Sequence, residues 1–91
     1  MSATPTVLVT GAGRGIGRSV VELFAESGWQ VVAGVRDVDA AQEAHAGRAA
    51  VHVTHLDVTD PASVRAGVAA AEAQAGGALT CVVSNAGYAV L

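Results

Sequence analysis

The chain has 91 residues, a formal net charge of −3 and a hydrophobic fraction of 52%. This length predicts one domain at most, and the negative charge argues against a general nucleic-acid-binding surface. No apolar run reaches membrane-spanning length, so we expect no membrane partner. The N-terminus lacks the basic and apolar regions of a signal peptide, and the single cysteine, Cys81, rules out an internal disulfide. A cytoplasmic protein is therefore the default expectation.

Apolar segments alternate with segments of helical periodicity along the chain. In chain order, strands are predicted at 6–10, 29–35, 50–56 and 79–83, and helices at 15–27, 39–45 and 61–75. The third helix is the best marked, because Asp60 can cap it, Pro61 suits its first position and Gly76-Gly77 stop it. Alternating strands and helices predict an α/β fold with a parallel sheet and right-handed crossovers.

Apolar positions at helical spacing predict the inner faces of the helices. In the third helix, the residues expected to face the sheet are Val64, Val68, Ala71 and Ala75. In the first helix, one apolar face is expected to consist of Ile16, Val20, Leu23 and Phe24. Because the chain has few aromatic residues, its core must be built from Ala, Val and Leu, which suits a parallel sheet buried on both faces.

Residues 10–17, Thr-Gly-Ala-Gly-Arg-Gly-Ile-Gly, form a glycine-rich segment between the first strand and the first helix. Glycines allow a sharp turn with positive φ and let a ligand approach the backbone closely. The helix that follows points its unpaired N–H groups and its positive dipole end at the turn. This arrangement predicts that the segment binds the pyrophosphate of a dinucleotide. The alternative is a glycine-rich turn with no ligand.

The spacing of the glycines narrows this prediction. The fingerprint G-x-G-x-x-G does not fit, because its third glycine would fall on Ile16 or Arg18. A P-loop needs glycine at position 12 and lysine at position 18, where Ala12 and Arg18 stand. The pattern that fits is T-G-x-x-x-G-x-G, with Thr10, Gly11, Gly15 and Gly17. This pattern resembles the short-chain dehydrogenase/reductase family.

The resemblance covers residues 6–88 and only the cofactor-binding half of that family. It implies that residues 1–91 form a partial NAD(P)-binding domain. Its fold would be a Rossmann-like, doubly wound parallel sheet with strand order 3-2-1-4, truncated after the fourth strand. It also implies that the glycine segment holds the cofactor through Thr10, Gly11, Arg14, Gly15, Ile16 and Gly17.

The end of the second strand bears on the choice of dinucleotide. An acidic residue there favours NAD, and a nearby arginine accommodates the 2′-phosphate of NADP. By resemblance the acidic position is Val35, and the arginine that follows it, Arg36, is similar to that of NADP-preferring members. Arg14 could reach the same phosphate. Asp37 works against this interpretation, because its carboxylate would repel the phosphate or pair with Arg36, so NADP is favoured and NAD stays open.

Two later motifs agree with the same fold. Asp57-Val58 follows the third strand, where the family's corresponding pair meets the adenine ring; the alternative is an ordinary loop carboxylate. The segment 84–87, Ser-Asn-Ala-Gly, resembles the family's Asn-Asn-Ala-Gly motif. The resemblance implies that Asn85 ties neighbouring strands together by hydrogen bonds. It also implies that Ala86 and Gly87 leave room for the adenosine ribose.

No catalytic residue is assigned in the chain. The family uses a Ser-Tyr-Lys group with the spacing Tyr-x-x-x-Lys, whereas this sequence has one tyrosine, Tyr88, and no lysine. The three histidines have no spacing or neighbours typical of a metal site.

The expectation is therefore the N-terminal segment of a short-chain oxidoreductase that transfers hydride between the nicotinamide and a carbonyl or alcohol substrate. The full-length protein is expected to form a homo-oligomer. The alternatives are a non-catalytic NADP(H)-binding module and an inactive truncated remnant.

Overall fold

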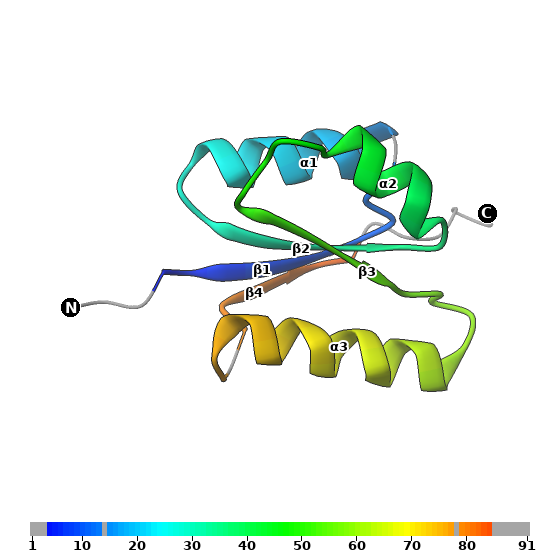
Figure 1. Ribbon diagram of the computed structural model, residues 1–91. Helices are drawn as coiled ribbons and strands as arrows, with labels where there is room; N and C mark the ends of the chain where they lie inside the picture. The colour runs from blue at the N-terminus through cyan, green and yellow to red at the C-terminus, as the bar shows by residue number, and fades with distance from the viewer. Residues whose placement is uncertain (1–3, 14, 78, 85–91) are drawn as a thin grey trace.

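Strands and helices alternate along the part of the chain that the computed structural model describes, residues 4–13, 15–77 and 79–84. The strands are β1 (Thr6–Thr10), β2 (Gln30–Val35), β3 (Val51–His55) and β4 (Cys81–Val83). The helices are α1 (Gly15–Glu26), α2 (Val38–Ala44) and α3 (Pro61–Ala75). The strands pair in parallel in the order β3-β2-β1-β4 (Figure 1). The predicted α/β class and strand order are confirmed.

Helices cover both faces of this sheet. Figure 1 shows α1 and α2 on one face and α3 on the other. Side chains alternate between these faces along each strand: Val7 and Val9 of β1 pack in the core cluster under α1 and α2, while Leu8 packs in the cluster under α3. Every residue of β1 is buried, as the apolar sequence of a central parallel strand predicts.

Helix α3 begins and ends where its sequence predicts. The Asp60 side chain caps it by accepting a hydrogen bond from the Ala62 N–H at 3.0 Å, and Gly76 ends it in the left-handed conformation with φ 75°. The helix lies close to the sheet because Gly67 faces Leu56: a Cβ on Gly67 would stand 2.6 Å from Leu56 Cδ1. The expected inner face is confirmed for Val64, Val68 and Ala71, which pack in the cluster under α3.

The inner face of α1 differs from the prediction. Ile16 and Leu23 are 76% and 63% exposed, whereas Gly17 and Val21 are buried. Successive helical residues lie about 100° apart, so Gly17 and Val21 share a stripe from which Ile16 points away. The prediction gave weight to large apolar side chains, whereas the buried stripe of α1 contains the small Gly17 together with Val21. Of the four residues expected inside, Val20 and Phe24 do pack against the core, at its margin.

Strand β4 is shorter than predicted and begins at Cys81 rather than at residue 79. The Thr80 side chain explains this, because its Oγ1 accepts the hydrogen bond from the Thr6 N–H at 3.2 Å. The Thr80 N–H in turn donates to the Thr6 carbonyl at 3.0 Å. A side-chain hydroxyl thus takes the place of a backbone acceptor, and the regular ladder starts one residue later. None of the helices in the described ranges has the length and apolar character needed to cross a bilayer.

The assignment of the α1 faces can be tested with two truncations. We expect Val21→Ala to lower the free energy of unfolding by about 2 kcal/mol, because it leaves a cavity at a fully buried site. Leu23→Ala should change it by less than about 0.5 kcal/mol, because that side chain is exposed. Urea denaturation of both variants measures the difference, and a larger loss for Leu23→Ala would contradict the assigned face.

Candidate functional site

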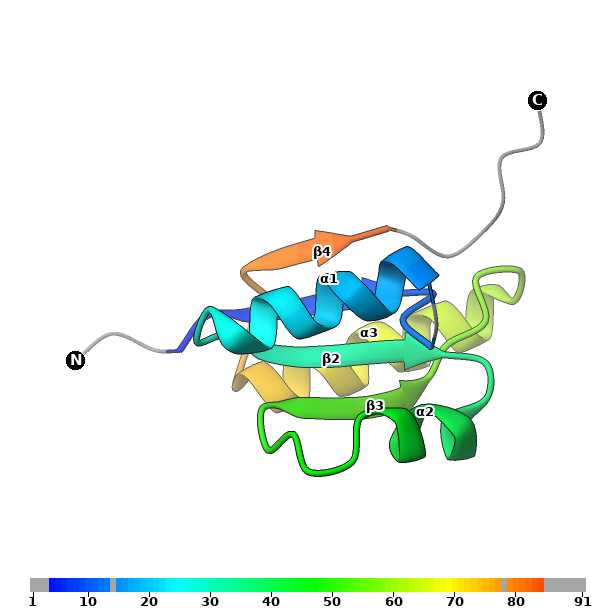
Figure 2. The same ribbon diagram turned by 90° about the horizontal axis from the view of Figure 1, so that it is seen from above.

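The candidate site lies at the carboxyl edge of the sheet. The register aligns the ends of three strands, with Thr10 opposite Gly34 and Gly34 opposite Thr54. The segments that leave β1, β2 and β3 consequently gather at one end of the molecule, together with the N-terminus of α1 (Figure 2). Ligands of open α/β sheets bind at this edge, where the strand order reverses. Here the reversal falls between β1 and β4.

The turn between β1 and α1 is built by two glycines. Gly11 and Gly15 have φ values of 64° and 63°, a conformation that L side chains rarely adopt. Between them, Ala12 is fully buried, and its N–H donates to the Gly34 carbonyl at 3.2 Å. The Thr10 hydroxyl donates to the Val83 carbonyl at 3.4 Å and so joins the ends of β1 and β4. The turn is thereby fixed to strands on both sides.

The beginning of α1 offers favourable surroundings for an anion. Gly15 and Ile16 are exposed, and among the described residues no atom outside the neighbouring residues and the backbone of α1 lies within 4 Å of the position that a Cβ on Gly15 would take. The first turn carries no acidic residue, so no carboxylate neutralises the positive end of the helix dipole. Gly17 is buried on the side of α1 that packs against the sheet. The predicted site residue Arg14 lies outside the described residues.

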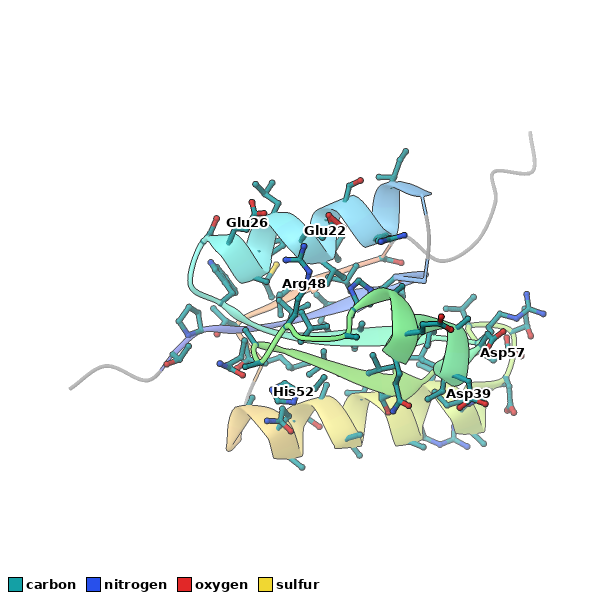
Figure 3. The ribbon with its side chains drawn as sticks, turned by 45° about the horizontal axis from the view of Figure 1, so that its top comes forward. Glu22, Glu26, Asp39, Arg48, His52 and Asp57 are labelled. Carbon is teal, nitrogen blue, oxygen red and sulfur yellow. The ribbon has the colours of Figure 1, made fainter. Side chains whose placement is uncertain are left out.

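Arg36 stands at the end of β2, exposed and with no carboxylate oxygen within 4 Å in the described part of the chain. Asp37, which the sequence suggested as its partner, is engaged elsewhere. Its Oδ1 caps α2 by accepting a hydrogen bond from the Ala40 N–H at 3.1 Å. Two other arginines do meet a carboxylate, since Arg18 lies 3.5 Å from Glu22. Arg48 lies 3.9 Å from the same carboxylate, and the side chains of Arg48 and Glu22 are labelled in Figure 3. Arg36 is thus available for a ligand.

Asp57 follows β3 at the same edge of the sheet (Figure 3). Its Oδ1 accepts hydrogen bonds from the Thr59 hydroxyl at 2.7 Å and from the Thr59 N–H at 2.9 Å. These bonds, with a smaller contribution from the charges of Arg36 and His55, hold the pKa of the Asp57 carboxyl below its ordinary value. The group is therefore an ionised acceptor at neutral pH. Its neighbour Val58 is 41% exposed and presents an apolar surface beside it.

The remaining residues of the expected site belong to the segment after β4. Ser84 is exposed directly beyond that strand. Asn85, Ala86 and Gly87 lie outside the described residues, so their predicted roles stay predictions.

One residue near the turn was not assigned from the sequence. His45 follows α2 and is 4% exposed, and its Nε2 lies 3.3 Å from the Ala12 carbonyl oxygen. The two residues are 33 positions apart in the sequence. No local pattern links a histidine after the second helix to the glycine turn, so this contact of His45 could not be predicted from the sequence. Its apolar neighbours in sequence are the only signal that it is buried.

The family profile for short chain dehydrogenase matches residues 5–91 of this chain. The chain belongs to the short-chain dehydrogenase family. Membership implies a nicotinamide dinucleotide, NAD or NADP, as the cofactor class.

Curated members of this family align along most of the chain, at 94% and 74% in the two cases that follow. L-fucose dehydrogenase from Bos taurus is 42% identical over 88 residues, which cover 94% of this chain and 32% of the relative. Sulfoacetaldehyde reductase from Chromohalobacter salexigens is 41% identical over 70 residues, 74% of this chain and 28% of the relative. The chain spans about a third of the length of the relatives it matches.

Solved structures show the same fold. The chain superposes on menthone neomenthol reductase from Mentha piperita with a TM-score of 0.81 and 33% identity, covering 96% of this chain and 33% of the other. Hydroxysteroid dehydrogenase from Escherichia coli gives a TM-score of 0.84 and 27% identity, with coverage of 92% and 37%.

The backbone of the glycine turn can be tested at two positions. We expect Gly15→Ala to lower the free energy of unfolding by roughly 1–2 kcal/mol, because alanine is strained in the left-handed conformation. Gly13→Ala should change it by less than about 0.5 kcal/mol, because φ is not positive there and its Cβ would meet Val35 Cγ1 at an ordinary 3.8 Å. Chemical denaturation distinguishes the two, and equal losses would show that the turn has a different conformation.

Proposed function

We propose that this chain holds the adenosine and pyrophosphate end of NADP in a short-chain oxidoreductase. The full reaction would transfer hydride between the nicotinamide and a carbonyl or alcohol substrate, and the nicotinamide supplies the redox chemistry when it is bound. The observation that carries the proposal is the turn between β1 and α1, with its positive-φ glycines and the open start of the helix. Residues 1–91 would then be part of an NAD(P)-binding domain.

The residues at the turn suit a pyrophosphate. The first N–H groups of a helix have no partner within the helix, and they face an exposed surface at Gly15 and Ile16. Anions bind at such helix ends because the N–H groups and the dipole both favour negative charge. We therefore assign pyrophosphate binding to the segment from Thr10 to Gly17, in which Arg14 remains a predicted contact.

The preference for NADP over NAD rests on Arg36. Its guanidinium follows β2, where the adenosine ribose lies in this fold, and Asp37 caps α2 rather than pairing with it. The residue before it, Val35, is 2% exposed, and its side chain has no atom that could accept a hydrogen bond from a ribose hydroxyl. A hydrogen bond to a charged group contributes about 1.5–3 kcal/mol, or roughly 10- to 150-fold in affinity. Arg36 would thus bind the 2′-phosphate.

The adenine ring is assigned to the segment after β3. The second carboxylate oxygen of Asp57 has no hydrogen-bond partner in the described ranges and is available to accept from the exocyclic amine. Val58 would cover one face of the ring with its exposed side chain. The Thr59 hydrogen bonds fix the carboxylate orientation before the ligand arrives. Asn85, Ala86 and Gly87 are proposed to border the ribose.

Hydride transfer would need residues that these 91 do not contain. The sequence has no lysine and one tyrosine, so the Tyr-x-x-x-Lys pair that this family uses is absent from it. The segment would therefore contribute cofactor binding, and the proton-transfer group would come from residues outside it. A non-catalytic NADP(H)-binding module is the second candidate.

The proposal is tested by titrating the chain with NADP and with NAD. We expect NADP to raise the melting temperature, and Arg36→Ala to weaken NADP binding by at least tenfold while leaving NAD affinity nearly unchanged, because one charged hydrogen bond is lost. Isothermal calorimetry measures both affinities. Arg65→Ala is the matched control, since it removes the same charge from an exposed site on α3.

Two results would count against the proposal. If neither dinucleotide binds or shifts the melting of the wild-type chain, the proposed function is wrong. If Arg36→Ala weakens NADP and NAD equally, the chain binds dinucleotides but Arg36 does not recognise the 2′-phosphate.

A further inference from the structure

A buried histidine lies behind the glycine turn. His45 is the C-terminal cap residue of α2, and its backbone N–H donates to the Ala41 carbonyl at 2.9 Å. Its ring is almost completely buried and reaches across to the turn, where Nε2 lies 3.3 Å from the Ala12 carbonyl oxygen. The contact joins the end of α2 to a backbone group of the turn that precedes α1.

The hydrogen-bond partner of Nε2 determines the tautomer of the His45 ring. A carbonyl oxygen only accepts hydrogen bonds, so Nε2 must carry the proton and donate it to Ala12, and Nδ1 is then an acceptor. Nδ1 is buried and has no hydrogen-bond partner among the described residues. Burying an unsatisfied acceptor is unfavourable, so apolar packing alone does not explain a histidine here. The Nε2 hydrogen bond is the interaction that distinguishes this ring from a leucine side chain.

This hydrogen bond also fixes the direction of the next amide. The Ala12 carbonyl and the Gly13 N–H belong to one peptide group, which is planar and trans, so they point in opposite directions. Because the carbonyl points at the buried ring of His45, the Gly13 N–H points away from it. The preceding peptide group is held as well, since the Ala12 N–H donates to the Gly34 carbonyl at 3.2 Å. The Gly13 N–H has no partner in the described part of the chain.

We propose that His45 is a positioning residue for the dinucleotide. Its Nε2–H holds the Ala12–Gly13 peptide so that the Gly13 N–H faces the anionic end of the ligand. Without this donor, the buried Ala12 carbonyl loses its partner, and the flexible Gly13 lets the peptide rotate. A rotated peptide would turn a carbonyl oxygen toward the phosphates and repel them. This inference rests on the proposed function and adds to it a residue that does not touch the ligand.

The test compares three substitutions of His45 in the whole 91-residue chain. His45→Gln keeps an amide N–H that can reach the position of Nε2, His45→Asn is polar but too short to reach it, and His45→Leu cannot donate. Val64→Ala, on the opposite face of the sheet, is the control for a general loss of stability. Calorimetry measures NADP affinity at a temperature at which circular dichroism shows every variant to be folded, and the amide resonance of Gly13 is followed without ligand.

We expect His45→Leu and His45→Asn to bind NADP about tenfold more weakly, a loss typical of one hydrogen bond to a charged ligand, and His45→Gln to bind within about threefold of wild type. The Gly13 amide resonance should shift from its wild-type position in the Leu and Asn variants and stay at that position in the Gln variant. Val64→Ala should change neither the NADP affinity nor the Gly13 resonance. If His45→Leu does not fold, the test compares His45→Asn with His45→Gln.

Unchanged affinity in a folded Asn or Leu variant would overturn the inference, and so would an equal loss in Gln and Asn. Failure of the wild-type chain to bind NADP would instead overturn the proposed function, and it is recognised in the wild-type titration alone.

Discussion

The geometry of the site depends on the backbone of one turn, between β1 and α1. Two glycines at positive φ reverse the chain there, and Ala12 between them is held through both of its peptide groups. Its N–H is bonded to β2 and its carbonyl to the ring of His45. The direction of the Gly13 N–H follows from these contacts. A ligand that needs this amide therefore depends on the sheet and on α2 as well as on the turn itself.

The sheet carries this turn because its strands are parallel and in register. Parallel pairing brings the carboxyl ends of β1, β2 and β3 to one edge, so Arg36 and Asp57 stand near the glycine turn although the sequence separates them. Packing on both faces keeps the edge in place: Gly17 and Val21 of α1 are buried on one side, and Gly67 lets α3 approach the other face over Leu56.

Local signals predicted most of the fold. The bounds of β1 and α3 follow from an apolar run and from a capping aspartate, a proline and a terminal glycine, all of which act within a few residues. The side of α1 that meets the sheet could not be derived this way, because it depends on how the whole helix packs on the sheet and not on which of its residues are large and apolar. Ile16 and Leu23 were therefore placed inside, although they are exposed. The role of Asp37 as the N-cap of α2 is a local contact within a few residues. The contact between His45 and Ala12, by contrast, exists only in the assembled fold.

In the proposed function, the amides of this turn and of the first turn of α1 face a pyrophosphate. The most direct measurement is an amide nuclear magnetic resonance titration of the chain with NADP. We expect the largest shifts at Gly13, Gly15, Ile16 and Gly17, while amides at the opposite ends of the strands, such as Thr6 and Val51, stay in place. Saturable shifts confined to other parts of the chain, or none at all, would contradict it.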